Sequence, residues 1–389
     1  MESTNTLQST IATKRERNYG IDLLRIICMI MIPILHILGH GGVLNGTTPL
    51  SFDFFAYWFV EIACYGAVNM FGIISGYVGV DSKFKLSNLV IIILRVLFYS
   101  IIISAIFFIA QLETITTSGV INALFPIARE QWWYITAYAA MFLFTPFINL
   151  AFRKIELKKM IAFVGLLFLI FACLICLVNA GNNPRILNGG YAPFWLLILY
   201  CFGALIKKLN DEKFSLFKKN YLNLLVAIGL ILLTFISMLI IAYATDGSML
   251  NVFNYQYLVS YVSPFVAGSS ILIVVFMKNI KIKNKVVIKG ISFIAPLCLS
   301  VYLIHDHNFM RAHIIKGNYT FLLNYNPLLS ILIVIASAIA IFICCCLIDL
   351  IREFIFKKTH LKTHLDNIEQ KAKDKIFGFI DKKIAKNKD

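Results

Sequence analysis

NYGIDLLRIICMIMIPILHILGHGGV, residues 18–43, decides the fold, because it is apolar over a length at which about 20 residues cross a membrane as a helix. Asp22, Arg25, His36 and His40 lie inside this segment. An ionisable side chain at the centre of a span costs about 2.5–3.5 kcal/mol on insertion scales, so such residues indicate a functional site. Arg25 and His36 are eleven residues apart. At about 1.5 Å per residue this is about 16 Å along a helix, and both side chains fall on nearly the same face.

The composition is that of a polytopic membrane protein. Of 389 residues, 59% are hydrophobic and 14% are charged, and the mean hydropathy is +0.80. Soluble domains are about 45–50% apolar and about 25% charged. The net charge of +16 would suggest a nucleic-acid partner in a soluble protein. In a membrane protein the positive-inside rule explains this charge, so we expect membrane lipid and no nucleic acid as partners.

Ten segments are long and apolar enough to be predicted spans, which gives an all-α fold class, a polytopic transmembrane helical bundle. They are roughly residues 20–43, 55–80, 88–112, 132–151, 160–179, 193–207, 221–244, 256–277, 290–310 and 327–351. The segment 193–207 is short, which favours a tilted or partly re-entrant helix. No Gly/Ser-rich linker interrupts the run, so residues 20–351 are predicted to form one transmembrane domain.

The Lys and Arg residues between the predicted spans set the orientation. If the N-terminus is cytoplasmic, 30 of the 36 lie in cytoplasmic segments, four lie in outer segments, and Arg25 and Arg95 lie within spans. This bias predicts that both termini are cytoplasmic, with a basic N-terminus at residues 1–19 and a basic tail at residues 352–389. We expect a multi-pass protein of the plasma membrane. The Asn-, Lys- and Ile-rich composition suggests a bacterial origin.

The tail has apolar residues at helical spacing with lysines between them. They are Leu361, Leu365, Ile368, Ala372, Ile376, Phe379 and Ile380. This pattern predicts a basic amphipathic helix that lies on the anionic inner leaflet. A solvated charged tail is the alternative.

Polar residues of several predicted spans lie at a similar depth near the outer membrane surface. His36 is in the first span, Glu61 is in the second, and His305 is toward the outer end of the ninth. Trp132 and Trp133, followed by Tyr134, open the fourth span at the same surface. A convergent polar cavity explains this layer. Each residue has a structural alternative: His36 could bond a backbone carbonyl, Glu61 could reach outward to the headgroups, and the tryptophans could belong to an interfacial belt.

The sequence contains no Gly-rich phosphate loop, no nucleophile elbow and no zinc-ligand spacing. This disfavours ATP-driven pumps and serine hydrolases and predicts that no metal or cofactor is bound. The remaining polar residues suit proton transfer by a histidine, the side chain that titrates near neutral pH.

These motifs resemble acyltransferase family 3, a family of integral membrane enzymes that includes bacterial O-acetyltransferases of surface polysaccharides. The first span of that family carries an arginine, ten residues and a histidine, which Arg25 and His36 match. Similar to further family elements are NMFGIISGYVGV (69–80), WWYITAYAAMFLFTPFIN (132–149) and SVYLIH (300–305). The resemblance covers about residues 18–350. The loop after the second span is often arginine-rich in the family, and here it offers Lys83 and Lys85.

The resemblance implies an acyltransferase that takes acetyl-CoA, or another acyl-CoA, as co-substrate from the cytoplasm. His36 would be the general base on a sugar hydroxyl, or would carry a transient acyl group, and Glu61 would fix its tautomer. Arg25 would contact both the donor and the substrate. The other implied contacts are His305, Trp133 and Tyr134 to the acceptor, and Ser75, Lys83, Lys85 and Arg95 to the donor.

The acceptor implied by the resemblance is a cell-surface or exported polysaccharide, with a lipid-linked glycan or a small molecule as the alternative. The main competing function is a transporter or flippase for polysaccharide or lipid-linked sugar, because ten spans with buried ionisable groups would suit one. The sequence shows neither inverted halves nor the paired Gly/Pro breaks common in transporters. A scaffold without activity does not explain Arg25 within a span.

Overall fold

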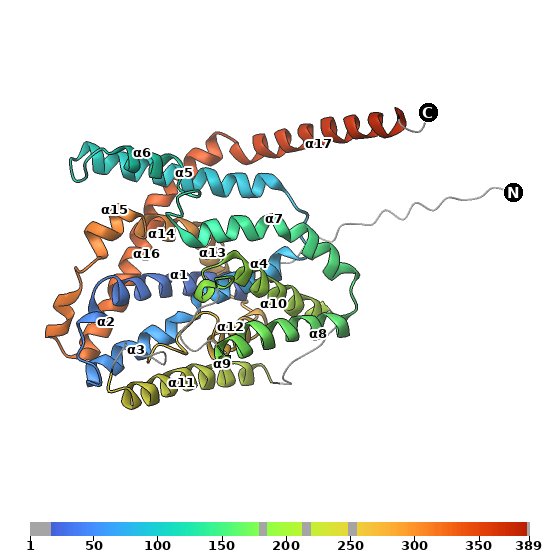
Figure 1. Ribbon diagram of the computed structural model, residues 1–389. Helices are drawn as coiled ribbons and strands as arrows, with labels where there is room; N and C mark the ends of the chain where they lie inside the picture. The colour runs from blue at the N-terminus through green and yellow to red at the C-terminus, as the bar shows by residue number, and fades with distance from the viewer. Residues whose placement is uncertain (1–16, 179–184, 212–218, 248–254, 387–389) are drawn as a thin grey trace.

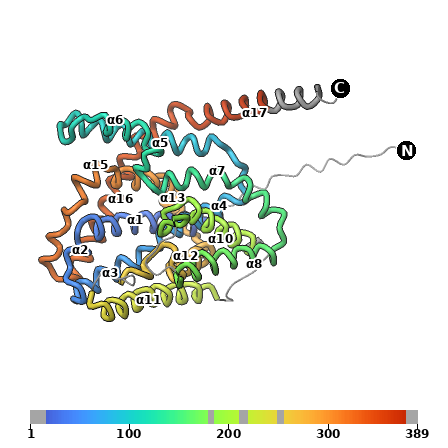
Figure 2. Tube along the Cα trace, in the orientation of Figure 1, coloured from blue at the N-terminus to red at the C-terminus, as the bar shows by residue number. Residues whose placement is uncertain are grey.

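The computed structural model describes residues 17–178, 185–211, 219–247 and 255–386, and over these ranges the chain is helical, without a β-strand. Figure 2 follows the chain through them. The helices are α1 (Tyr19–Gly39), α2 (Val43–Gly46), α3 (Phe52–Tyr65), α4 (Ala67–Gly79), α5 (Leu86–Ile109), α6 (Thr117–Leu124), α7 (Trp133–Lys154), α8 (Leu157–Phe168), η1 (Leu169–Leu174), α9 (Ile175–Val178), η2 (Asn188–Gly190), α10 (Pro193–Asp211), α11 (Asn220–Ala244), α12 (Pro264–Lys278), α13 (Lys285–Ile294), η3 (Ala295–Leu297), α14 (Cys298–His305), α15 (Asn308–Met310), η4 (Arg311–Ile315), η5 (Thr320–Asn324), α16 (Pro327–Lys358) and α17 (Leu361–Lys386).

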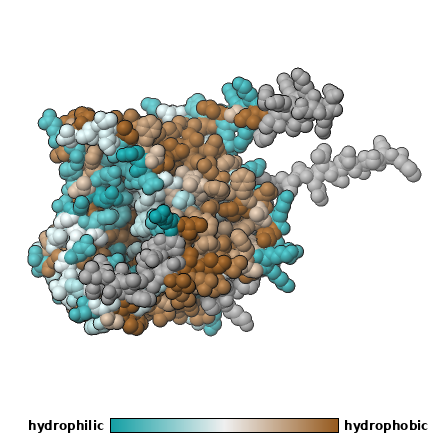
Figure 3. Space-filling view, viewed as in Figure 1, coloured by the Kyte–Doolittle hydropathy of each residue, from teal (hydrophilic) through white to brown (hydrophobic). Residues whose placement is uncertain are grey.

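Long apolar helices run alongside one another and form the predicted polytopic bundle (Figure 1). Eight helical segments are long and apolar enough to cross a membrane: Tyr19–Gly46, Phe52–Gly79, Leu86–Ile109, Trp133–Lys154, Leu157–Val178, Asn220–Ala244, Lys285–His305 and Pro327–Lys358. In Figure 3 apolar surface covers much of the visible face, and polar side chains gather toward its two ends. This distribution fits a lipid-facing belt with an aqueous region on either side.

The two other predicted spans fall on α10 and α12. These helices have 19 and 15 residues, respectively. The prediction for the second began near residue 256, but α12 begins at Pro264, because proline favours the first position of a helix and residues 255–263 form turns. The count of ten spans therefore stays a prediction, while the helical bundle is confirmed.

Interruptions in two of the span candidates, Phe52–Gly79 and Lys285–His305, place residues at the cavity described below. Phe52–Gly79 is divided at Gly66 into α3 and α4. Lys285–His305 contains the 3-10 turn η3, whose Pro296 has no backbone N–H to continue the helical hydrogen bonds. The guanidinium of Arg95 donates a 3.2 Å hydrogen bond to the Pro296 carbonyl. A side chain from α5 thus bonds the backbone at this interruption.

The contact between α4 and α10 depends on two glycines. A Cβ on Gly76 would lie 1.9 Å from the backbone oxygen of Tyr200, and a Cβ on Gly203 would lie 1.9 Å from that of Ile73. Small residues let two membrane helices approach this closely. We conclude that Gly76 serves helix packing.

The tail forms the predicted helix, α17, and carboxylates on it cap the start of α5. The Glu369 carboxylate accepts hydrogen bonds from the backbone N–H groups of Leu86 (3.1 Å) and Ser87 (2.9 Å). Asp366 accepts bonds from the Ser87 hydroxyl (2.5 Å) and from Lys85 (3.1 Å). These contacts matter because the N-cap residue of α5, Lys85, makes no side-chain cap of its own. In Figure 1 α17 extends on the side of the bundle where α1 begins.

The last predicted span extends further than expected. The prediction ended it at residue 351, whereas α16 continues to Lys358. Arg352 and Asp349 are both buried on this helix and form an ion pair of 2.7 Å. Because each charge of the buried pair has a partner, the helix can continue through these residues to Lys358.

Candidate active site

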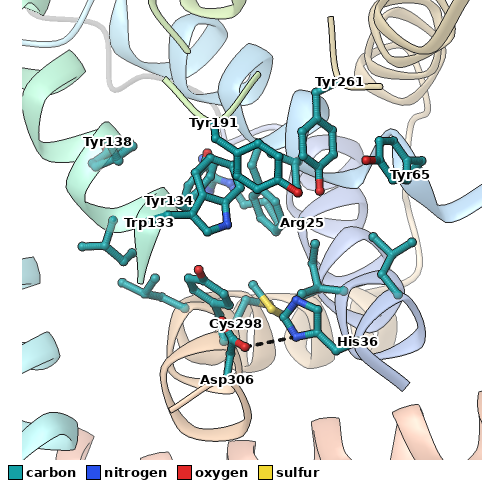
Figure 4. Close-up of a pocket in the computed structure, with 18 of the residues that line it drawn as sticks. Arg25, His36, Tyr65, Trp133, Tyr134, Tyr138, Tyr191, Tyr261, Cys298 and Asp306 are labelled. Carbon is teal, nitrogen blue, oxygen red and sulfur yellow. Dashed lines mark ion pairs between the residues drawn. The ribbon is translucent and has the colours of Figure 1, made fainter. Parts of the chain in front are cut away.

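A cavity of about 690 Å³ lies between α1, α3, α4, α7 and the η3–α14 region, and it is within the usual size range of ligand sites. Arg25 and His36, which the sequence places on one face of α1, both line it. Figure 4 shows His36 and Asp306 on one side of this space and a group of aromatic rings on the other. The cavity therefore joins a cation and an imidazole inside the bundle.

His36 is held by a histidine from a distant part of the chain. The Nδ1 of His36 lies 3.0 Å from the Nε2 of His305, and the Nδ1 of His305 lies 2.5 Å from the carbonyl oxygen of Val301. His305 is the last residue of α14, and Val301 is one turn before it. His305 is 3% exposed and does not line the cavity, so it lies behind His36.

These hydrogen bonds decide which nitrogen of each neutral imidazole carries the proton. A carbonyl oxygen only accepts, so the Nδ1 of His305 donates to Val301 and its Nε2 is an acceptor. The Nδ1 of His36 must then donate to His305. This leaves the Nε2 of His36 unprotonated, and no hydrogen bond to it is found among the described residues. An unprotonated, unbonded nitrogen on a residue that lines a cavity is what a general base requires.

Asp306 adds a negative charge next to the same ring. Its Oδ1 lies 3.5 Å from the Nδ1 of His36 and accepts a 3.0 Å hydrogen bond from Arg311. The carboxylate is 3% exposed, and Arg311 also donates to Asn308 at 3.1 Å. A fixed carboxylate beside the Nδ1–H orients an imidazole and stabilises its protonated form.

His36, His40 and Asp306 also have ligand atoms within 4.8 Å of one another. Three such ligands could in principle hold a metal ion. Here the Nδ1 of His36 is engaged by His305, and Asp306 is ion-paired with Arg311. These contacts explain the arrangement as a hydrogen-bonded base, and the absence of a metal stays a prediction.

Arg25 lies at the part of the cavity nearer the start of α1. Its Nη1 donates a 2.9 Å hydrogen bond to Asp22, and the Nε of Arg17 donates to the other oxygen of the same carboxylate at 2.5 Å. One carboxylate thus faces two guanidinium groups, which leaves a net positive charge. Arg25 is 31% exposed, and a guanidinium has five N–H donors. Donors remain for an anionic or carbonyl-containing ligand.

The wall of the cavity that faces His36 and Asp306 is aromatic (Figure 4). The rings of Trp133 and Tyr191 are 4.4 Å apart between centroids, and those of Tyr65 and Tyr261 are stacked at 4.6 Å. Tyr191 and Tyr261 are in edge contact at 5.3 Å. Glu61, from α3, also lines the cavity and is 8% exposed. The wall thus has apolar faces, phenol groups and one carboxyl group.

The family comparison agrees with this chemistry. The model of acyltransferase family 3, described as an acyltransferase domain, matches residues 18–350. The chain belongs to acyltransferase family 3. The match begins one residue before α1 and ends within α16, so it includes every residue that lines the cavity. Comparisons with curated proteins and with solved structures gave no match.

Not all the residues that were predicted for the acyltransferase site lie at the cavity. Arg25, His36, Glu61, Ser75, Trp133 and Tyr134 line it. His305, predicted to contact the acceptor, lies behind His36 instead. Glu61 was expected to fix the tautomer of His36, but the contacts of the His36 Nδ1 are with His305 and Asp306. The roles of all these residues stay predictions.

The cations predicted to bind the donor of the acyltransferase are dispersed. Arg95 is bonded to the carbonyl of Pro296, which lines the cavity, although Arg95 does not line it. Lys85 pairs with Asp366 of α17 at 3.1 Å, and Lys83 is exposed outside the cavity. Arg25 is therefore the predicted donor-binding cation that the structure places inside the cavity.

Sequence reasoning missed several residues of the acyltransferase cavity. Asp306 directly follows the motif SVYLIH, and the sequence places it at the depth of His36, but depth and spacing cannot show that it faces His36. Tyr191 and Tyr261 belong to none of the motifs quoted above and lie in turns between helices, although Tyr261 falls within the predicted span 256–277. For Tyr191 the sequence signal is the pair of glycines before it. Gly189 and Gly190 have φ of 64° and 99°, which places Tyr191 at the end of a tight turn.

Proposed function

We propose that the protein is a membrane O-acyltransferase that moves an acyl group, in the first instance acetyl, from acyl-CoA to a hydroxyl of a surface or exported polysaccharide. The observation that supports this proposal best is the arrangement of His36. Its Nδ1–H is engaged by His305 beside Asp306, and its Nε2 is free in a cavity that also contains Arg25.

The two ends of the cavity suit the two substrates. Acyl-CoA carries phosphates, and the positive cytoplasmic segments would attract it from that side. Arg25 lies about 16 Å from His36 along α1, at about 1.5 Å per residue, so it would contact the pantetheine or phosphate oxygens while the thioester lies near His36. No step through a bound cofactor is needed, since acyl-CoA is a co-substrate.

The reaction requires one proton to be moved twice. The Nε2 of His36 takes the proton of the acceptor hydroxyl as its oxygen attacks the thioester carbon. The carbon–sulfur bond then breaks, and the CoA thiolate takes the proton back from His36. The products are the O-acyl ester and CoA with a free thiol. Asp306 stabilises the imidazolium that exists between the two transfers.

A labelled-donor experiment tests the proposal. Membranes that contain wild-type protein, His36→Ala or His364→Ala are incubated with labelled acetyl-CoA and the polysaccharide of the host cell. His364 is an exposed histidine on α17, outside the cavity, and serves as the matched control. We expect label in polysaccharide with wild type and His364→Ala, and a loss of about 100-fold or more with His36→Ala, as general bases typically contribute.

The other outcomes are informative. Wild-type activity in His36→Ala would remove the base assignment. Label in the lipid fraction would assign a lipid-linked glycan as the acceptor. Sugar transport that does not depend on acyl-CoA, without ester formation, would show a transporter or flippase instead.

A further inference from the structure

The aromatic wall of the cavity has no part in the proton transfer described above. It consists of Tyr65, Trp133, Tyr191 and Tyr261, from four separate segments of the chain. The turn Asn188–Gly190 brings Tyr191 against Tyr261, since a Cβ on Gly190 would lie 2.4 Å from the Cβ of Tyr261. Tyr191 is 41% exposed even though it is in ring contact with two neighbours. A face of this wall is thus available to a ligand.

Glu61 provides a second, independent observation at the same wall. Its carboxyl is 8% exposed, and its Oε2 is buried with no hydrogen-bond partner among the residues described. Leaving a buried polar atom unpaired costs about 1–3 kcal/mol, and more when the group is charged. Native proteins rarely keep such an atom unless a ligand or water satisfies it. The side chain lines the cavity, so a ligand there can bond it once the carboxyl group turns its unpaired oxygen toward the ligand.

We infer that Glu61 and the aromatic wall form the acceptor subsite, which binds a neutral pyranose ring of the glycan. This inference rests on the proposed function, in which the acylated hydroxyl belongs to a sugar. A pyranose has a C–H face, which packs against aromatic rings, and hydroxyl groups at its edge. Trp133 and Tyr191 take the C–H face, and Glu61 accepts a hydrogen bond from a hydroxyl at the edge.

The position of the wall explains how the sugar would be aligned for reaction. In Figure 4 the wall lies across the cavity from His36 and Asp306, and the hydroxyl oxygens of Tyr191 and Tyr261 lie close together in the space between. A ring bound on the wall can therefore turn another of its hydroxyls toward the Nε2 of His36. Glu61 then acts on the acceptor and His36 on the proton, which separates two roles that the sequence analysis had joined.

The subsite also sets a preference. A uronic acid would bring a charge into a buried site beside another carboxyl group, and a buried charge without a partner is costly. We therefore expect neutral hexopyranoses to bind at this position in preference to their uronic acid counterparts.

Direct binding measurements test the subsite without turnover. The His36→Ala protein in nanodiscs is titrated with methyl glucoside, methyl galactoside, methyl rhamnoside and methyl N-acetylglucosaminide, with ligand-observed saturation-transfer NMR as the readout. We expect saturable binding of at least one, weakened about tenfold or more by Glu61→Ala and by Tyr191→Leu. Tyr325→Leu is the control, because Tyr325 is exposed and outside the cavity.

Two comparisons are needed. One separates a loss of sugar binding from a folding defect, and the other separates failure of the subsite from failure of the proposed function. Glu61→Gln keeps the shape of the side chain, and every variant must retain the acyl-CoA affinity of the His36→Ala parent. Saturable sugar binding that Glu61→Ala and Tyr191→Leu leave unchanged, or no binding of any of the four glycosides, overturns the subsite. Sugar binding as expected, in a wild-type protein that shows no CoA-dependent transfer, overturns the proposed function alone.

Discussion

Arg25 and His36 lie on one helix and line one cavity, but the protein positions them in different ways. Arg25 is bonded to Asp22, three residues away on α1. His36 is bonded to His305, 269 residues away, beside Asp306. The comparison teaches that helix spacing alone can place a binding cation, whereas a base needs partners from another part of the chain to fix its tautomer. Substitutions at the two ends should therefore change different kinetic constants.

The largest effect after loss of His36 itself is expected from Asp306→Asn. Asparagine keeps the size of the side chain but cannot stabilise the imidazolium, so kcat should fall by about 100-fold or more, as in related carboxylate–histidine sites. The KM for acyl-CoA should stay nearly unchanged, because Asp306 lies at the other end of the cavity from Arg25. Steady-state kinetics with varied acyl-CoA measures both constants.

Asp246→Asn is the matched control for this substitution, since Asp246 is an exposed carboxylate outside the cavity. If Asp306→Asn raised the KM for acyl-CoA more than it lowered kcat, the assignment of Asp306 to the base would be wrong.

Arg25→Ala should mainly weaken donor binding. Hydrogen bonds to charged groups contribute about 1.5–3 kcal/mol, so the KM for acyl-CoA should rise by about 10- to 100-fold, while kcat changes much less. Arg25→Lys should restore part of this affinity, because lysine keeps the charge but lacks the planar guanidinium. Arg129→Ala serves as the control, because Arg129 bonds Asn122 away from the cavity. If Arg25→Ala left the KM for acyl-CoA unchanged, Arg25 would not bind the donor, and the proposed difference between Arg25 and His36 would be wrong.

The sequence was sufficient for the parts of the site that depend on one helix. The spacing of Arg25 and His36 correctly predicts that both face one cavity, because a regular helix carries that information. Ser75 and Trp133 also lie in helices whose apolar patterns are unambiguous, and they reach the cavity as expected. The helical bundle follows for the same reason.

The partners of His36 could not be predicted from the sequence in the same way. Asp306 follows the last residue of α14, and its orientation depends on Arg311, which the sequence analysis counted as an outer-loop residue. His36 contacts His305 and Asp306 through its Nδ1. The sequence favoured Glu61 for this place because depth in the membrane is one coordinate, and two residues at one depth can face different walls. The predicted start of α12, near residue 256, was wrong. The helix begins at Pro264, because proline favours the first position of a helix, and the apolar residues before it do not show this.

A packing variant separates the shape of the cavity from the chemistry of its ends. Gly76→Ala would place a Cβ against the backbone of Tyr200, so α4 and α10 must move apart. We expect a loss of about 1–3 kcal/mol of stability, as overpacking usually costs, seen as a lower Tm in detergent. Gly165→Ala is the control, because nothing lies within 4 Å of a Cβ there. An equal Tm for the two variants would show that the α4–α10 contact is not needed.

The smallest effect is expected at the contact between α17 and the start of α5, whose bonded residues do not line the cavity. Hydrogen bonds from Lys362, Ser87 and Lys85 hold the pKa of the Asp366 carboxyl below its usual range. A carboxyl with a lowered pKa stabilises the folded contact above its ordinary pKa of 3.8 and loses that contribution as the pH falls further. The contact should therefore be constant between about pH 8 and pH 5 and weaken only in stronger acid.

Asp366→Asn combined with Glu369→Gln should loosen α17 at neutral pH while transfer activity stays within about twofold, since neither residue lines the cavity. Spin labels at positions 83 and 371 report the distance between the start of α5 and α17. Asp374→Asn is the control, because Asp374 accepts its hydrogen bond from Gln370 on the same helix. If the double substitution instead reduced transfer as strongly as Arg25→Ala does, the tail would contribute to the donor end of the cavity, and the contrast between Arg25 and His36 would have to include α17. An unchanged label distance would show that the apolar side chains of α17, and not its carboxylates, hold it in place.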